Sequence, residues 1–186
     1  MSKEILESIK DDMYSKMNSS IELFKNELNG VQTGRVHRNL ISKIIVQTND
    51  GNMPLEQVSS ITLKDLSTMT IQIWNASHLQ DVRKALENSK VGLLIRTEGQ
   101  TIYATAPMLT QERRKELQKL ISNYREKERL KLRNHRKDAL DKIKEYKKSV
   151  SEDVLKVMEE KVDKVIQEFN TKVDKMTEEK NKEIMS

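Results

Sequence analysis

Residues 110–148, TQERRKELQKLISNYREKERLKLRNHRKDALDKIKEYKK, decide the fold because they contain no helix breaker. Glycine and proline cost about 1 and 3 kcal/mol inside a helix relative to alanine, so their absence favours one continuous helix. Thr110 is a suitable N-cap, and the helix is expected to end at about Lys148. One side of it carries side chains that recur every three or four positions, at Leu117, Ile121, Tyr124, Leu132, His135, Ala139, Ile143 and Tyr146.

Two further segments resemble this one. All five glycines and both prolines lie between Gly30 and Pro107, so the chain on either side of that interval is free of breakers. Ser151, followed by two acidic residues, predicts the start of a last helix. The first stripe is Ile9, Met13, Met17, Ile21, Phe24, Leu28 and Val31, and the last is Val154, Met158, Val162, Val165, Phe169, Val173 and Met176. None of these amphipathic helices is stable alone, so we expect a three-helix bundle.

The middle of the chain has a different pattern. Thr68 to Trp74 alternates apolar and polar residues, as a half-buried strand does, and Trp74 is assigned to the core. Further predicted elements are strands at Ile41–Gln47, Ile61–Leu63, Val91–Ile95 and Thr101–Thr105, a turn at residues 49–52 and a helix at Ser77–Asn88. The sequence therefore predicts an α+β protein: residues 1–31 and 106–186 form the bundle, and residues 32–105 form an inserted small mixed α/β domain.

The two connections between these domains must lie side by side, because the inserted domain leaves the bundle and returns to it. One connection contains Gly34 and the other contains Pro107. Two adjacent single-chain connections make relative domain motion the default expectation. Gly34 and Pro107 are therefore the predicted hinge residues.

The second long helix is strongly basic, since residues 107–148 hold 15 basic and 7 acidic side chains. Arg125, Arg129, Arg133 and Arg136 follow one another at spacings of four, four and three, which confines them to an arc of about 80°. The guanidinium group matches phosphate with a planar fork of donors, so an all-arginine ridge favours a nucleic-acid backbone. The alternative is an ordinary solvated charged face, with Glu126 and Glu128 neutralising part of it. No aromatic residue interleaves the ridge, which favours a duplex or folded RNA over a single strand.

Composition excludes several functional classes. The chain has no cysteine and only three isolated histidines, so no metal centre is expected, and His135 is interpreted as a core residue. Residues 32–35 lack the spacing of a phosphate-binding loop, and no nucleophile, base and orienting group can be paired. We expect no enzyme activity and no cofactor.

No apolar run is long enough to span a bilayer, and the N-terminus resembles neither a signal nor a transit peptide. The chain is therefore expected in the cytoplasm, or in an organelle matrix if a transit peptide was removed.

Several motifs, in the same order along the chain, resemble the ribosome recycling factor family. They are Gln32-Thr33-Gly34-Arg35, Met53-Pro54-Leu55, residues 109–115 (LTQERRK) and residues 129–139 (RLKLRNHRKDA). The resemblance runs over essentially the whole chain. It implies a long antiparallel three-helix bundle and a small α/β domain, joined by a two-strand hinge as an L. The family's RNA-contacting arginines fall on Arg35, Arg129, Arg133 and Arg136, whereas Arg125 rests on spacing alone.

The function that the resemblance implies is that of a monomeric translation factor. It would bind large-subunit ribosomal RNA and, together with elongation factor G and GTP, split the ribosome after termination. The arginine ridge would hold the RNA while the translocase pushes the hinged small domain. An alternative from another class is a helical chaperone or scaffold that holds protein clients through the inserted domain.

Overall fold

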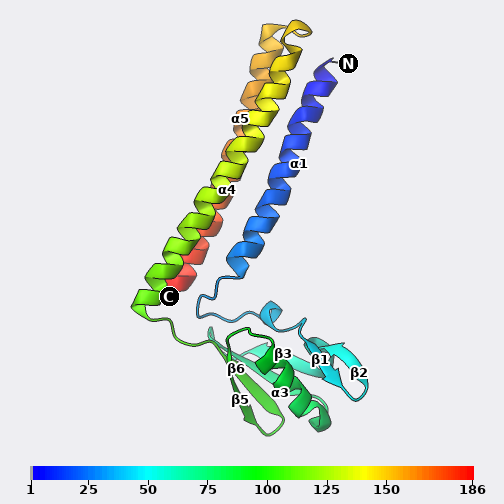
Figure 1. Ribbon diagram of the computed structural model, residues 1–186, viewed down its shortest axis with the longest axis vertical. Coiled ribbons are helices and arrows are strands. Elements are labelled where there is room, and N and C mark those ends of the chain that lie inside the picture. The colour runs from blue at the N-terminus through cyan, green and yellow to red at the C-terminus, as the bar shows by residue number, and fades with distance from the viewer. Residues whose placement is uncertain (1) are drawn as a thin grey trace. The chain divides into compact units, whose positions relative to one another are not determined.

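The computed structural model describes residues 2–186, and they form two compact units (Figure 1). The helical unit comprises the described residues up to Gln32 together with Gln111–Ser186. The α/β unit is Thr33–Thr110. An α/β unit is thus inserted into a helical one, as expected for this fold class. Among the described residues, no helix has both the length and the apolar character needed to cross a membrane.

The helical unit is a bundle of α1 (Ser2–Asn29), α4 (Gln111–Glu145) and α5 (Glu152–Met185), which run alongside one another in Figure 1. A 3-10 turn at Tyr146–Lys148 follows α4. Contacts between the helices give their directions: α1 meets α4 through Ser20–Glu128 and Asp12–Lys142, and α4 meets α5 through Arg129–Asp174 and Arg136–Asp163. Sequence neighbours α4 and α5 are therefore antiparallel, and α1 is antiparallel to α4.

The core of the bundle consists of the predicted apolar stripes. Most of their members are buried, with Met17, Phe24 and Phe169 fully enclosed. The ring of Tyr14 on α1 packs edge-on against Phe169 on α5, with centroids 5.2 Å apart. Glu7 on α1 also pairs with Lys161 on α5. Hydrogen bonds from the Lys10 and Lys161 ammonium groups lower the pKa of Glu7 from 4.5 to about 2.

One core position departs from the sequence interpretation. Glu128 was expected to neutralise the arginine ridge, and that interpretation is wrong, because Glu128 is fully buried. Its Oε1 accepts a hydrogen bond of 2.5 Å from the Ser20 hydroxyl on α1, and its Oε2 lies 3.2 Å from Lys131 Nζ. The reason is helical spacing: Glu128 stands four residues after Tyr124 and four before Leu132, so it occupies a position in the apolar stripe.

The α/β unit contains a hairpin and a larger antiparallel sheet. The hairpin pairs β1 (Ile45–Thr48) with β2 (Gly51–Pro54). The sheet has the order β3-β4-β6-β5, built from β3 (Ser59–Leu63), β4 (Thr68–Ile73), β5 (Leu94–Glu98) and β6 (Thr101–Thr105). Short α2 (Leu55–Val58) joins hairpin and sheet, and α3 (Leu79–Asn88) connects β4 to β5. Short 3-10 turns occupy Arg38–Leu40 and Ala76–His78.

The predicted strands at Thr68–Trp74, Ile61–Leu63 and Thr101–Thr105 are confirmed to within two residues. The strands predicted at Ile41–Gln47 and Val91–Ile95 begin later, with β1 at Ile45 and β5 at Leu94. The segment before β1 is taken up by the 3-10 turn and a further turn, and a turn with positive φ at Lys90 and Gly92 precedes β5. The predicted turn at residues 49–52 is the tip of the hairpin, whose second strand was missed because Gly51–Pro54 contains both a glycine and a proline.

The core of the α/β unit lies against one face of the larger sheet. Met69, Ile71 and Ile73 of β4 are buried there, together with Val82 and Leu86 of α3. The assignment of Trp74 to the core is wrong, since its side chain is 64% exposed. Side chains alternate between the faces of a strand, so the residue that follows Ile73 points away from the core.

Both connecting segments bind the loop between β3 and β4. The Val36 amide donates to the Leu66 carbonyl at 2.9 Å, and the Ala106 amide donates to the Ser67 carbonyl at 2.8 Å. Gly34 has φ +75°, which favours glycine, and its α-carbon faces the Leu109 side chain. The two connections therefore lie side by side within the α/β unit.

Candidate nucleic-acid interface

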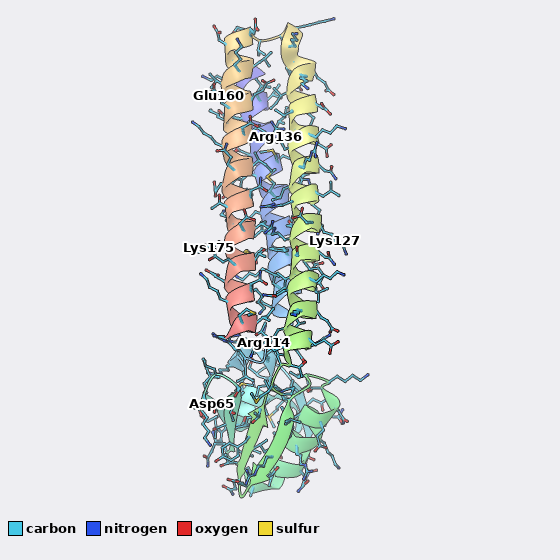
Figure 2. All side chains as sticks on the ribbon, turned by 90° about the vertical axis from the view of Figure 1, so that its left-hand side faces the viewer. Asp65, Arg114, Lys127, Arg136, Glu160 and Lys175 are labelled. Carbon is cyan, nitrogen blue, oxygen red and sulfur yellow. The ribbon has the colours of Figure 1, made fainter. Side chains whose placement is uncertain are left out.

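The four arginines of the predicted ridge share one flank of α4, beside α5. Figure 2 shows Arg136 between the ribbons of α5 and α4, whereas Lys127 lies on the outer side of α4. Their side chains are at least a third accessible: Arg125, Arg129 and Arg136 are 35%, 36% and 39% exposed, and Arg133 is exposed. The ridge is therefore available to an outside partner, as its spacing on the helix predicts.

Three of the four arginines are held by carboxylates of α5. The Arg129 guanidinium donates to Asp174 Oδ1 at 2.6 Å, and Arg125 Nε lies 3.9 Å from the same oxygen. The Arg136 Nε and terminal nitrogen lie 2.8 and 2.7 Å from Asp163 Oδ1. Glu126 lies near Arg125 and Arg129, at 3.4 and 3.8 Å. These ion pairs extend the arginine side chains across the seam between the two helices.

Arg133 differs from its neighbours. Its side chain makes no hydrogen bond or ion pair with any residue in the range 2–186. It lines a groove of about 600 Å3 between α4 and α5, to which α5 contributes Asp163 and Ile166 as well as the neutral amides of Gln167 and Asn170. Arg129 borders both this groove and a second one of about 490 Å3, which continues along the seam past Arg125 towards Met185. The ridge thus bounds a shallow track with an unpaired guanidinium at its centre.

The energies of the two kinds of contact decide what the track can do. Ion pairs between exposed side chains contribute only about 0.2–1 kcal/mol. A charge-assisted hydrogen bond to phosphate contributes about 1.5–3 kcal/mol when it is well formed. A polyanion can therefore displace the α5 carboxylates from Arg129 and Arg136. The surface suits the phosphates of a nucleic acid.

Not every predicted site residue belongs to this cluster. Arg35 lies in the α/β unit, so it is not among the residues that α4 and α5 bring together. Gly34 and Pro107 also lie in the α/β unit, where the Pro107 carbonyl faces Gly34. Within residues 2–186, no group of three or more histidine or acidic side chains is placed to hold a metal ion.

The sequence interpretation missed the residues that α5 contributes. Asp163, Gln167, Asn170 and Asp174 all line the two grooves. Their spacing of four, three and four places them on one face of a helix, so the periodicity was present in the sequence. The sequence did not show that this face of α5 lies beside the arginine ridge of α4. Both faces are polar, so no apolar stripe marks them as neighbours.

The protein therefore belongs to a class built from a bundle of long helices, with a basic surface on α4, into which an α/β unit is inserted. A family model described as "Ribosome recycling factor" matches residues 24–185. The ribosome-recycling factor of Deinococcus radiodurans is 41% identical over 128 residues, which cover 69% of this chain and 70% of that one. This chain belongs to the ribosome recycling factor family.

Solved structures agree with this assignment. A solution structure of a ribosome recycling factor superposes with a TM-score of 0.79 at 31% identity, covering 97% of each chain. A second similar structure is a model of the T. thermophilus ribosome recycling factor, bound with E. coli elongation factor G to the E. coli post-termination complex. It has a TM-score of 0.65 and 34% identity, and the match covers 97% of this chain and 99% of that one.

Proposed function

We propose that this chain recycles ribosomes after termination, by splitting the post-termination complex together with elongation factor G and GTP. The single observation that carries the proposal is the arginine ridge of α4, which stands on the fold of a ribosome recycling factor. A related factor has been placed on the post-termination complex with elongation factor G. The chain would act in the cytoplasm and would carry out no covalent chemistry itself.

The proposed mechanism is mechanical. Arg125, Arg129, Arg133 and Arg136 hold the phosphates of large-subunit ribosomal RNA, and Arg35 adds a contact from the α/β unit. The translocase supplies the work through GTP hydrolysis and acts on the α/β unit. Movement of the bundle against the ribosome then breaks the contacts between the subunits. This division of labour fits a surface that offers fixed positive charge to phosphate groups.

Subunit splitting is the experiment that tests the function. Post-termination ribosomes are mixed with the chain, elongation factor G and GTP, and dissociation is followed by light scattering. We expect splitting only when all three components are present. We also expect the chain to co-sediment with large subunits and to be released as salt rises, because phosphate contacts release counterions. Binding to unfolded protein without binding to ribosomes would support the chaperone alternative instead.

We also propose that Gly34 and Pro107 mark the hinge through which the α/β unit moves. Because the chain has no cysteine, dyes can be attached to cysteines introduced at Glu22 on α1 and at Gln100 in the β5–β6 turn. Energy transfer between them is expected to change when elongation factor G and GTP are added to the ribosome-bound chain. The matched control places both dyes in the helical unit, at Glu22 and Lys175, where no change is expected. Splitting without any change in the first pair would contradict the hinge.

A further inference from the structure

The face of α5 that borders the ridge has an ordered pattern of charge. Asp163, Gln167, Asn170 and Asp174 succeed one another along it, so the order is carboxylate, amide, amide, carboxylate. The spacing of four, three and four keeps all of them on the same side of the helix. Two negative charges thus flank a neutral centre on the helix that faces the arginines.

The availability of the arginines follows this pattern. The carboxylates at the two ends bind Arg136 and Arg129, at 2.7 and 2.6 Å. Arg133 shares its groove with the two amides, and neither amide side chain makes a hydrogen bond within the described residues 2–186. The α5 carboxylate in this groove, Asp163, pairs with Arg136, so the Arg133 side chain faces the amides without an ion pair of its own.

We propose that Asp163 and Asp174 are intramolecular competitors of RNA phosphate, which set the affinity of the ridge and leave Arg133 as its first point of contact. This inference rests on the proposed function, since it concerns the strength of the same RNA contact. The amides of Gln167 and Asn170 face the phosphate that Arg133 receives. They can donate hydrogen bonds to it without opposing its charge.

Competition follows from the donors that the pairs use. Both Nε and a terminal nitrogen of Arg136 approach Asp163 Oδ1, and together they form one of the edges with which a guanidinium can bind a phosphate through two parallel hydrogen bonds. A phosphate that binds this edge must replace the carboxylate, and a phosphate that binds elsewhere on the guanidinium meets the negative charge of Asp163 nearby. Because Asp163 and Asp174 are about half exposed, at 48% and 47%, this replacement weakens RNA binding without preventing it.

A lower affinity for RNA suits a factor that must leave its binding site in every cycle. When the chain begins to dissociate, Asp163 and Asp174 can recapture Arg136 and Arg129 one at a time. Each recapture replaces one phosphate contact, so the arginines are never all unpaired at once. The opposite role would have the carboxylates hold the arginines in the conformation that RNA needs. The two roles predict changes of opposite sign.

The test measures the dissociation constant of the full-length chain on isolated large ribosomal subunits. Asp163→Asn removes the competing charge at nearly constant shape, and we expect binding about two- to fivefold tighter, the factor that an exposed ion pair provides. Asn170→Asp places a carboxylate opposite Arg133, and we expect binding about fivefold weaker. The matched control is Glu160→Gln on the outer side of α5, which removes the same charge away from the seam (Figure 2).

Each outcome decides the inference. Tighter binding by Asp163→Asn than by Glu160→Gln, together with weaker binding by Asn170→Asp, supports competition. Weaker binding by Asp163→Asn overturns it and makes Asp163 a positioning residue. No difference between Asp163→Asn and Glu160→Gln, or unchanged binding by Asn170→Asp, also overturns it. Failure of the unaltered chain to bind large subunits would instead contradict the proposed function. Circular dichroism of each variant confirms that the helices are intact.

Discussion

Replacing Arg133 and Arg136 together with alanine is expected to weaken binding to large ribosomal subunits by about 100-fold. Each substitution removes a charge-assisted contact to phosphate, which contributes about 1.5–3 kcal/mol when it is well formed. Arg133→Ala alone should weaken binding more than Arg136→Ala alone. The Arg133 side chain has no partner within residues 2–186, so it gives up no ion pair when it binds phosphate. Arg136 must first leave Asp163, so part of its contact energy is already offset. Co-sedimentation over a range of salt concentrations measures both effects.

The matched control for this double variant is Lys127→Ala with Lys142→Ala. It removes the same charge from α4, but Lys127 lies on its outer side, and Lys142 lies towards α1, 3.8 Å from Asp12. We expect a change of a few-fold only, from the loss of long-range attraction. Equal losses in the two double variants would mean that total charge, rather than the ridge, holds the ribosome. Unchanged binding after loss of Arg133 and Arg136 would remove the ridge from the mechanism.

The helices and the ridge could be predicted because their causes are local in sequence. An apolar stripe with a helical period predicts both the helix and the face that it buries, and Met13, Met17 and Phe169 confirm this. The angular position of Arg133 relative to that stripe follows from the same period, which is why its exposure was predictable. Strand β4 was predictable for the same reason, from its alternating residues.

Other features depend on which elements meet, and sequence periodicity does not supply that. The ion pairs of Asp163 and Asp174 require that α5 lie beside the ridge. Glu128 was assigned to the surface because it is charged, although its spacing placed it in the core. Its burial becomes intelligible only when Ser20, more than a hundred positions away in the sequence, is brought next to it. Trp74 shows the reverse error, because its apolar character outweighed the alternation that placed it outside.

The buried carboxylate of Glu128 leads to the second large effect. Ser20→Ala is expected to lower the free energy of unfolding of the helical unit by about 1.5–3 kcal/mol, because it removes the 2.5 Å hydrogen bond to a fully buried charge. Urea unfolding followed by far-ultraviolet circular dichroism reports on the long helices. Fluorescence of Trp74, which is the only tryptophan and lies in the α/β unit, reports separately on that unit and is expected to change little.

Ser19→Ala is the matched control, since the Ser19 hydroxyl is exposed and donates to the Ser15 carbonyl of its own helix. It should change stability by less than about 0.5 kcal/mol. Adding Glu128→Leu to Ser20→Ala is expected to restore most of the loss, because an apolar side chain then replaces a buried carboxylate that has lost the Ser20 hydrogen bond. Such recovery would show that the pair contributes little net stability. A loss of stability from Ser20→Ala no larger than that from Ser19→Ala would contradict this account. If the double variant recovers, the role of the Ser20–Glu128 pair is to fix α1 against α4 at a position next to Arg129.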